Sequence, residues 1–246
     1  MTAGTQTAEA VKDPISRLGG GFMMSREVKQ ASQEVGLPGW QTYFRGRCGV
    51  LGEAETDVVT SVAVFFPDAA VREGWEDGQT VPAADAAYRY AKACQQWGRR
   101  KLAGFDSCAR LAELLGRVAE QADVAGAPLF AGWREMPLPD DPPGRLAQLA
   151  HVLREHRGGL HAVAVLASGL APLEAVLTSQ YGADNARFFG WPEPYPELGE
   201  DVRRRRARAE ELTGELIAPA FAALSESETA ELVKLLDGAM GTAFPD

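Results

Sequence analysis

The spacing of apolar residues is that of α-helices along almost the whole chain, and this constrains the fold more than any other feature. In DSCARLAELLGRVAEQAD, for example, one face of a helix would carry Leu111, Leu114, Leu115 and Val118. No segment convincingly shows the strict alternation of a half-buried strand. The segment DVVTSVAVFF (57–66) is rich in β-branched residues and suits either a strand or a buried helix. We therefore expect a mainly α protein.

Capping residues and helix breakers divide this pattern into separate helices. Ser25 is a typical N-cap for a helix that Gly36 would end, and Ser225 with Glu228 forms a capping box. A long helix is predicted over residues 82–103, with proline in its first turn. These signals predict a bundle of helices joined by short loops.

The segment AGWREMPLPDDPPG holds four prolines within seven residues and is the clearest loop in the chain. It predicts a domain boundary, with a helical domain over 24–136 and a second one over 144–246. Residues 1–23 are rich in small and polar side chains and run through three consecutive glycines, so they are expected to form a flexible N-terminal arm.

Charge and composition exclude several classes of protein. The 246 residues carry a net charge of −9, which argues against broad nucleic-acid binding because phosphates attract cations. No signal peptide and no apolar run long enough to span a membrane is visible, so a cytoplasmic protein without a membrane partner is expected. The three cysteines are widely spaced, and neither a metal site nor a cofactor is predicted.

All three histidines lie within the eleven residues HVLREHRGGLH. We expect Gly158 and Gly159 to end a helix there. On that helix His151 and Glu155 would face solvent, whereas His156 would project near the apolar face.

His161 would begin the next helix, so the corner between the two helices could bring His156, Arg157 and His161 together. Such a polar pocket suits a polar or anionic ligand, and His156 or His161 would be the general acid or base if chemistry occurs. The alternative is structural: a histidine stabilised by a helix C-terminus, with His161 bonded to a backbone carbonyl.

A second polar set lies in WQTYFRGRCGVLG, where Tyr43, Arg45 and Arg47 stand beside large apolar residues. The arginines could reach an interior anion, or could simply lie along the surface with their charges in water. A pocket between helices would then be lined by aromatic side chains, namely Trp40, Tyr43, Phe44, Phe65, Phe66 and Phe130.

The run Arg203–Arg206, followed by Arg208, suggests contact with phosphate or DNA. Acidic residues surround the run, however, and Arg206 with Glu210 and Arg208 with Glu211 have the spacing of helical ion pairs. A solvated, self-neutralised face is the favoured interpretation.

Several segments together resemble a family of poorly characterised actinobacterial proteins described as helix-turn-helix proteins. They are YFRGRCGVLG, GAPLFA, LREHRGGLHAVAVLASGL and the later Gly190-Trp191. The resemblance covers roughly residues 38 to 240. The segment ELTGELIAPAFAALSESETAELVKLL is also similar to the dimerising helices of multiple-antibiotic-resistance-type winged-helix regulators. The resemblance implies helical bundles of winged-helix ancestry, and homodimers.

The chain departs from a winged helix where DNA would be read. Only PEPYPELGED lies between Trp191 and Val202, which is too short and too acidic for a recognition helix and a wing. We therefore expect a degenerate winged-helix-like C-terminal half that keeps a ligand cavity, and DNA binding is not expected.

These observations favour a small-molecule-binding protein, either an enzyme of specialised metabolism or a sequestering resistance protein. Whether it catalyses a reaction is left open. The pocket would be anchored by His156, Arg157 and His161, with Arg45 or Arg47 as further contacts. The alternative is a ligand-responsive, dimeric transcriptional regulator that binds DNA through Arg203–Arg206 exposed on one face.

Overall fold

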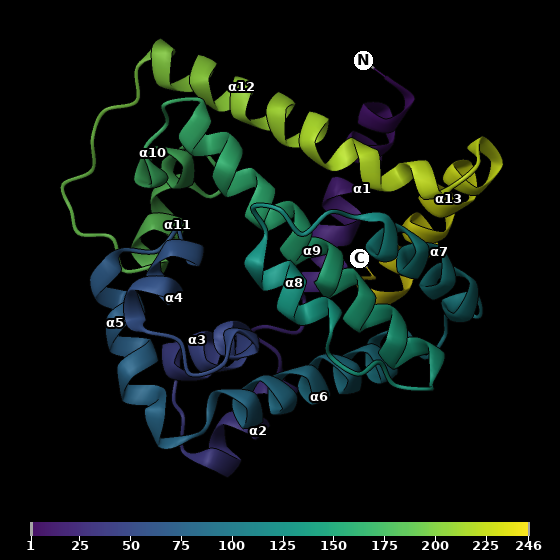
Figure 1. Cartoon of the computed structure of the whole chain (residues 1–246), viewed down its shortest axis with the longest axis horizontal. Coiled ribbons are helices and arrows are strands. Elements are labelled where there is room, and N and C mark those ends of the chain that lie inside the picture. Colours follow the sequence, from purple (N-terminus) through teal and green to yellow (C-terminus); the bar gives the residue numbers. More distant parts are fainter. Residues whose placement is uncertain (1, 246) are drawn as a thin grey trace.

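The computed structural model describes residues 2–245, and within them it contains thirteen α-helices, three short 3-10 helices and no strand (Figure 1). The mainly α class is therefore confirmed. The ambiguous segment 57–66 lies mostly in helix α4 (Thr56–Val62), which ends before Ala63. Within residues 2–245, no helix is both long and apolar enough to cross a membrane.

Helix α9 (Pro142–Ala167) is the centre of the fold. Around it pack α1 (Ala3–Gly20), α6 (Ala83–Lys101), α7 (Cys108–Gln121) and α12 (Glu200–Ile217) (Figure 1). Because it is surrounded, α9 has buried apolar side chains on more than one face. Helix α9 thus contacts helices that lie on both sides of the proline-rich loop in the sequence.

The predicted end of a helix at Gly158-Gly159 is wrong, because α9 continues through both glycines to Ala167. Glycine weakens a helix interior by about 1 kcal/mol, but tertiary packing can outweigh that cost. Gly159 has a packing reason: a Cβ there would lie 2.8 Å from the Cα of Ala127.

Residues 3–20 form helix α1, although the sequence predicted a flexible arm over residues 1–23. The helix buries Ala8, Val11, Ile15 and Leu18, which lie on one face. Gly19 lets this helix approach α9, since a Cβ at that position would lie 2.4 Å from the carbonyl oxygen of Ala150. The small residues that suggested disorder serve close packing.

The other elements surround this centre. The remaining α-helices are α2 (Arg26–Val35), α3 (Trp40–Cys48), α5 (Asp68–Glu76), α8 (Pro128–Arg134), α10 (Pro172–Leu177), α11 (Gly182–Phe188) and α13 (Glu226–Ala243). The 3-10 helices are η1 (Gly49–Leu51), η2 (Asp77–Thr80) and η3 (Ala218–Ala223).

Two predicted caps are confirmed. The Ser25 hydroxyl accepts a hydrogen bond from the Val28 amide at 3.4 Å, and Gly36 ends the same helix in a left-handed conformation. Ser225 and Glu228 form the expected capping box at the start of α13.

Candidate functional site

His151 and Glu155 do not face solvent, as the sequence predicted, but are buried with exposed fractions of 0% and 1%. The His151 ring packs edge-on against Phe22 and Trp133, which the turn after α1 and helix α8 bring to this face of α9. Burial lowers the pKa of His151 to about 4. The histidine is therefore neutral at physiological pH.

The Glu155 carboxylate holds two arginines in the interior. Arg47 donates to it through Nε at 2.9 Å and Nη2 at 2.7 Å, and Arg154 Nη1 donates at 2.8 Å. Burial opposes the ionisation of this carboxyl, but the two guanidinium charges outweigh it and lower the pKa to about 2. Glu155 is thus the anionic centre that fixes Arg47.

The predicted corner does not bring His156 together with His161, although Arg157 and His161 do lie on one face of α9. Because α9 is continuous, residues five apart point about 140° away from each other. His156 packs against Phe130, with ring centroids 4.7 Å apart, and its pKa is lowered to about 4 by burial and by Arg134. His156 and Phe130 are therefore core residues away from His161.

His161 lies at the junction of α9 and α12. Its Nδ1 is 2.8 Å from the hydroxyl of Thr213, which itself donates to the carbonyl of Ala209 at 2.7 Å. Nδ1 therefore donates and Nε2 accepts, and Nε2 faces Arg206 Nη1 at 3.2 Å. This neutral form agrees with a pKa lowered to about 4, chiefly by burial.

A cavity of about 290 Å³ lies beside His161, and we call it the arginine cavity. Its lining includes six residues that the sequence predicted for a pocket: Tyr43, Arg47, Phe65, Phe66, Arg157 and His161. Two further arginines that the sequence did not assign to it, Arg154 and Arg206, also line it.

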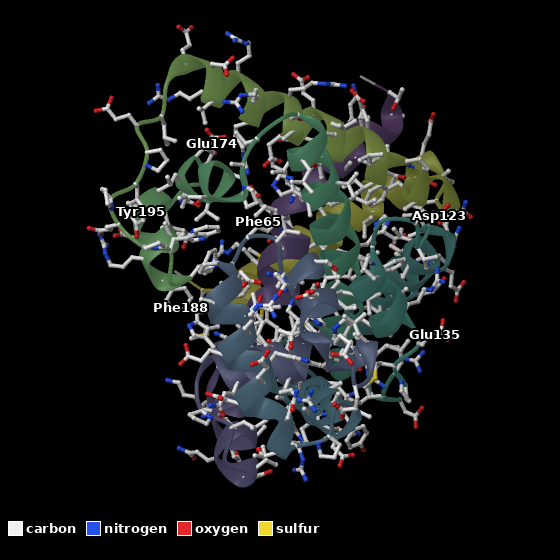
Figure 2. The ribbon with its side chains drawn as sticks, turned by 60° about the vertical axis from the view of Figure 1, so that its left-hand side comes forward. Phe65, Asp123, Glu135, Glu174, Phe188 and Tyr195 are labelled. Carbon is white, nitrogen blue, oxygen red and sulfur yellow. The ribbon has the colours of Figure 1, made fainter. Side chains whose placement is uncertain are left out.

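The aromatic side chains divide between this cavity and the core behind it. Trp40 and Phe44 do not line the cavity but pack behind Phe66, with ring centroids 5.2 and 5.1 Å from it. Phe65 packs against apolar clusters of α9–α12 and lies where the α10–α11 side meets the rest of the molecule (Figure 2).

Arg45 lies away from the cavity, contrary to its predicted role. Its guanidinium stacks over Trp75 at 4.3 Å and donates to Glu53 at 2.8 Å and to the carbonyl of Val81 at 2.8 Å. With 1% of its surface exposed, it holds α3 to the segments that flank α6.

The cysteines Cys48, Cys94 and Cys108 are free and buried. Burial raises the pKa of the Cys48 thiol to about 12 and that of Cys108 to about 11. Within residues 2–245, no group of three His, Cys, Asp or Glu side chains is arranged to hold a metal ion.

The arginine run of α12 is split between solvent and protein. Arg203 and Arg204 are exposed, whereas Arg205 and Arg206 are half-buried. The predicted ion pairs are confirmed: Arg206 pairs with Glu210, and Arg208 with Glu211 at 3.3 Å. The run therefore does not form one exposed cationic face.

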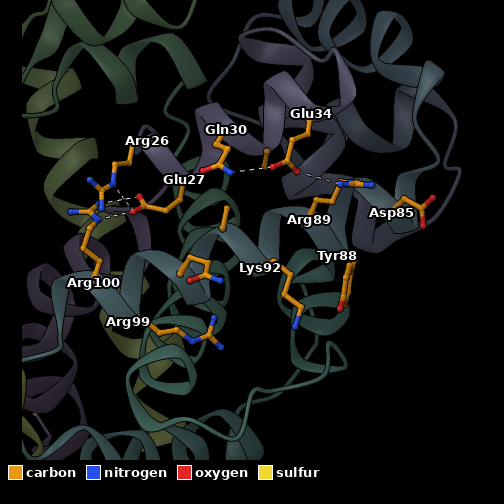
Figure 3. A pocket seen from close by; sticks show the side chains of 13 residues that line it. Arg26, Glu27, Gln30, Glu34, Asp85, Tyr88, Arg89, Lys92, Arg99 and Arg100 are labelled. Carbon is orange, nitrogen blue, oxygen red and sulfur yellow. Dashed lines mark hydrogen bonds and ion pairs between the residues drawn. The ribbon is translucent and has the colours of Figure 1, made fainter.

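A wide polar groove of about 1080 Å³ lies between α2 and α6, and we call it the α2–α6 groove (Figure 3). Its cations are Arg26, Arg89, Lys92, Arg99 and Arg100. Its carboxylates are Glu27, Glu34 and Asp85. Cations outnumber carboxylates in this lining, although the whole chain is acidic; one of them, Arg99, is paired at 2.5 Å with Asp141, which lies outside the lining.

Ion pairs occupy some of these charges. Arg100 donates to both oxygens of Glu27, at 2.6 and 2.9 Å, and lowers the pKa of that carboxyl to about 2. Arg89 lies 3.7 Å from Glu34. Lys92 forms no ion pair with any of the residues described, and Figure 3 shows it beside Tyr88 along the groove. The sequence alone does not show that α2 lies beside the arginines that end α6.

Helices α2 and α3 form a pair joined by a four-residue turn. Gly36 and Gly39 of this turn have φ angles of 70° and 54°, which favour glycine. In the second helix, α3, all residues from Phe44 to Cys48 are buried. In the first helix, α2, only Val28 is buried.

The chain matches a family described as a helix-turn-helix family over residues 8–244. No curated protein and no solved structure matches it. A helix-turn-helix is the arrangement with which many proteins place a helix on DNA. This match overturns two expectations from the sequence, namely that DNA binding is absent and that the main function is to bind or convert a small molecule. Because the match spans nearly the whole chain, the protein belongs to this helix-turn-helix family.

Proposed function

We propose that the protein is a dimeric, ligand-responsive regulator that binds DNA through the α2–α6 groove, with α2 as the helix that reads the bases. The observation that carries this proposal is an excess of cations beside an exposed helix that leads into a glycine turn, in a helix-turn-helix family member.

The net charge of −9 does not oppose such local contact, because salt screens charges more than about 10 Å apart. Within the α2–α6 groove, Glu27 is neutralised by Arg100. Lys92 and Arg26 are exposed and stand on the two helices that line the groove. Phosphates would bind between these cations.

Helix α2 has the size and side chains for base readout. Its ten residues span about 15 Å, and the major groove is about 12 Å wide. One exposed face carries Lys29, Gln30 and Gln33. Lysine suits guanine, and glutamine suits adenine. Helix α3 is buried, which favours the first helix of the pair as the reader.

Helix-turn-helix proteins commonly bind as dimers to two half-sites about one helical turn of DNA apart. We include a homodimer in the proposal, in agreement with the resemblance found in the sequence. Light scattering of the purified chain, free and with DNA, measures this directly: twice the chain mass on DNA supports it, and a single chain per site contradicts it.

A gel shift at about 50 mM salt with random-sequence duplex DNA tests the proposal. The variant Arg89→Ala/Lys92→Ala removes two groove cations, whereas Arg203→Ala/Arg204→Ala removes two exposed arginines of α12 and serves as the matched control. We expect the groove variant to lose about tenfold or more in affinity and the control to bind as the parent does. Absence of DNA binding by the parent protein would overturn the proposal.

A further inference from the structure

We infer that the arginine cavity binds an organic anion with an aromatic or apolar body. As a regulatory site the cavity rests on the proposed function, but as a binding site it stands on its own contacts.

The charges around the cavity are unbalanced. Four arginines line it, namely Arg47, Arg154, Arg157 and Arg206. They are paired with two carboxylates: Glu155 takes Arg47 and Arg154, and Glu210 takes Arg157 and Arg206. The hydrogen bonds of His161 fit its neutral form, so this residue adds no charge. Two positive charges are left without a counter-charge beside the cavity, where an anion would be stabilised.

Arg47 is the best placed of these side chains to bind an anion. Only 10% of it is exposed, and its Nε and Nη2 are taken by Glu155. Its Nη1 has no hydrogen-bond partner among the residues described. A buried guanidinium with a free N–H group favours an oxygen of a carboxylate, sulfonate or phosphate.

The remaining wall determines the rest of the ligand. The wall includes the apolar side chains of Val62, Phe65, Phe66, Val176 and Phe189, together with the polar Ser16, Ser179 and Asn185. A volume of about 290 Å³ suits a small molecule, and a wall of this kind favours one whose anionic group is attached to a ring or a short apolar chain. A bare inorganic anion would leave this apolar surface wet.

Gly158 leaves room on the α9 side of the cavity. It lies inside α9 and lines the cavity, yet a Cβ built there meets no atom within 4 Å. Neighbouring Gly159 is required by the close backbone of Ala127, just before α8, but no contact in the described residues requires Gly158. A glycine that weakens its helix and borders open space keeps that space open.

The arginine cavity is also connected to the proposed DNA reader. Arg47 lies in α3, which the Gly36–Gly39 turn joins directly to α2. An anion that binds Arg47 would compete with Glu155 for this guanidinium. It would thereby change how α3, and through it α2, is held to α9. This is the contact through which ligand and DNA would influence each other's affinity.

The test uses the fluorescent anion 8-anilinonaphthalene-1-sulfonate, with uncharged N-phenyl-1-naphthylamine as its counterpart, on the folded full chain. We expect one dye per chain, with the anion bound at least about tenfold more tightly than the uncharged dye. Gly158→Leu should fill the cavity and lower the affinity for the anion about tenfold or more. Its control is Gly214→Leu, at a helical glycine that also has open space and lines none of the cavities described. That control should bind as the parent does.

Arg157→Met provides a second variant. It removes one cation and should lower the affinity for the anionic dye but not for the uncharged dye. Equal affinity of the parent and Gly158→Leu, or equal affinity for both dyes, would overturn the inference. The two proposals fail separately. If the protein binds the dye but not DNA, the anion site stands and the proposed DNA-binding function is wrong. If it binds DNA but not the dye, the DNA-binding function stands and the anion site is wrong.

Discussion

Arg47 on α3 and Glu155 on α9 form a buried two-bond ion pair, with N–O distances of 2.9 and 2.7 Å, across 108 residues of sequence. The pair fixes the N-terminal helices to the centre of the fold. It also presents one face of Arg47 to the arginine cavity. Structural support and anion recognition therefore meet in one guanidinium.

Glu155→Gln should destabilise the protein by about 3–5 kcal/mol, because it leaves Arg47 and Arg154 buried or half-buried without their counter-charge. Urea unfolding at pH 7.5 measures the loss. Glu211→Gln, at an exposed carboxylate of α12, should change the free energy of unfolding by less than about 1 kcal/mol. Similar values for both variants would show that Glu155 does not hold the interior together.

Stability should begin to fall with acidification at a pH above the range in which carboxyl groups titrate. The pKa values of His151, His156 and His161 are each lowered to about 4, so the unfolded chain binds protons at higher pH than the folded one. Their contribution is complete above pH of about 6.5 and is lost as the pH falls towards 4. Urea unfolding between pH 7.5 and 4.5 should show this fall.

His156→Phe removes one of the three histidines and so measures its share of the proton uptake on unfolding. The variant keeps a ring against Phe130 and should reduce the slope of stability against pH by the share of one histidine. A slope in the variant equal to that of the parent would assign the proton uptake to other groups.

The two adjacent glycines of α9 should respond in opposite directions. Gly158→Ala should stabilise the chain by up to about 1 kcal/mol, since its Cβ meets open space and alanine favours a helix. Gly159→Ala should destabilise it by about 1–3 kcal/mol, since its Cβ would press on Ala127. Thermal unfolding of the two variants decides this, and shifts of the same sign would contradict the packing described here.

Base readout by α2 predicts a change in sequence preference rather than in overall affinity. Gln33→Ala should reduce discrimination at one base position by about 1–3 kcal/mol, while leaving the salt dependence unchanged. Lys92→Ala, at a groove cation placed against phosphate, should instead weaken all sequences alike. Selection from a random duplex library with each variant measures both. An unchanged preference in Gln33→Ala would exclude that side chain from readout.

The sequence predicted those parts of the fold that depend on local chemistry. The caps at Ser25 and Ser225 and the helix over 82–103 depend on neighbouring residues, and the structure has all three. The course of α9 through Gly158-Gly159 depends on packing against the segment that leads into α8, which the sequence does not display. The burial of His151 likewise depends on the turn after α1 and on α8, which cover it.

The sequence indicated only some of the cavity residues, because the packing of distant helices decides the others. Tyr43, Arg47 and His161 do line one cavity, but Arg206 could be assigned to it only once α12 was placed against α9. The expectation against DNA binding relied on net charge, which averages over the whole surface. The α2–α6 groove gathers cations from residues 26 to 100, and no local stretch of sequence displays that excess.

The salt dependence of DNA binding tests the central claim most directly. Fluorescence anisotropy of a labelled duplex, at several salt concentrations between about 50 and 200 mM, gives the slope of log affinity against log salt, which is about −0.9 for each phosphate contact. We predict a negative slope for the parent that becomes shallower by nearly 2 in Arg26→Ala/Lys92→Ala. An identical slope in parent and variant, or no binding at the lowest salt, would contradict the α2–α6 groove as the site of DNA contact.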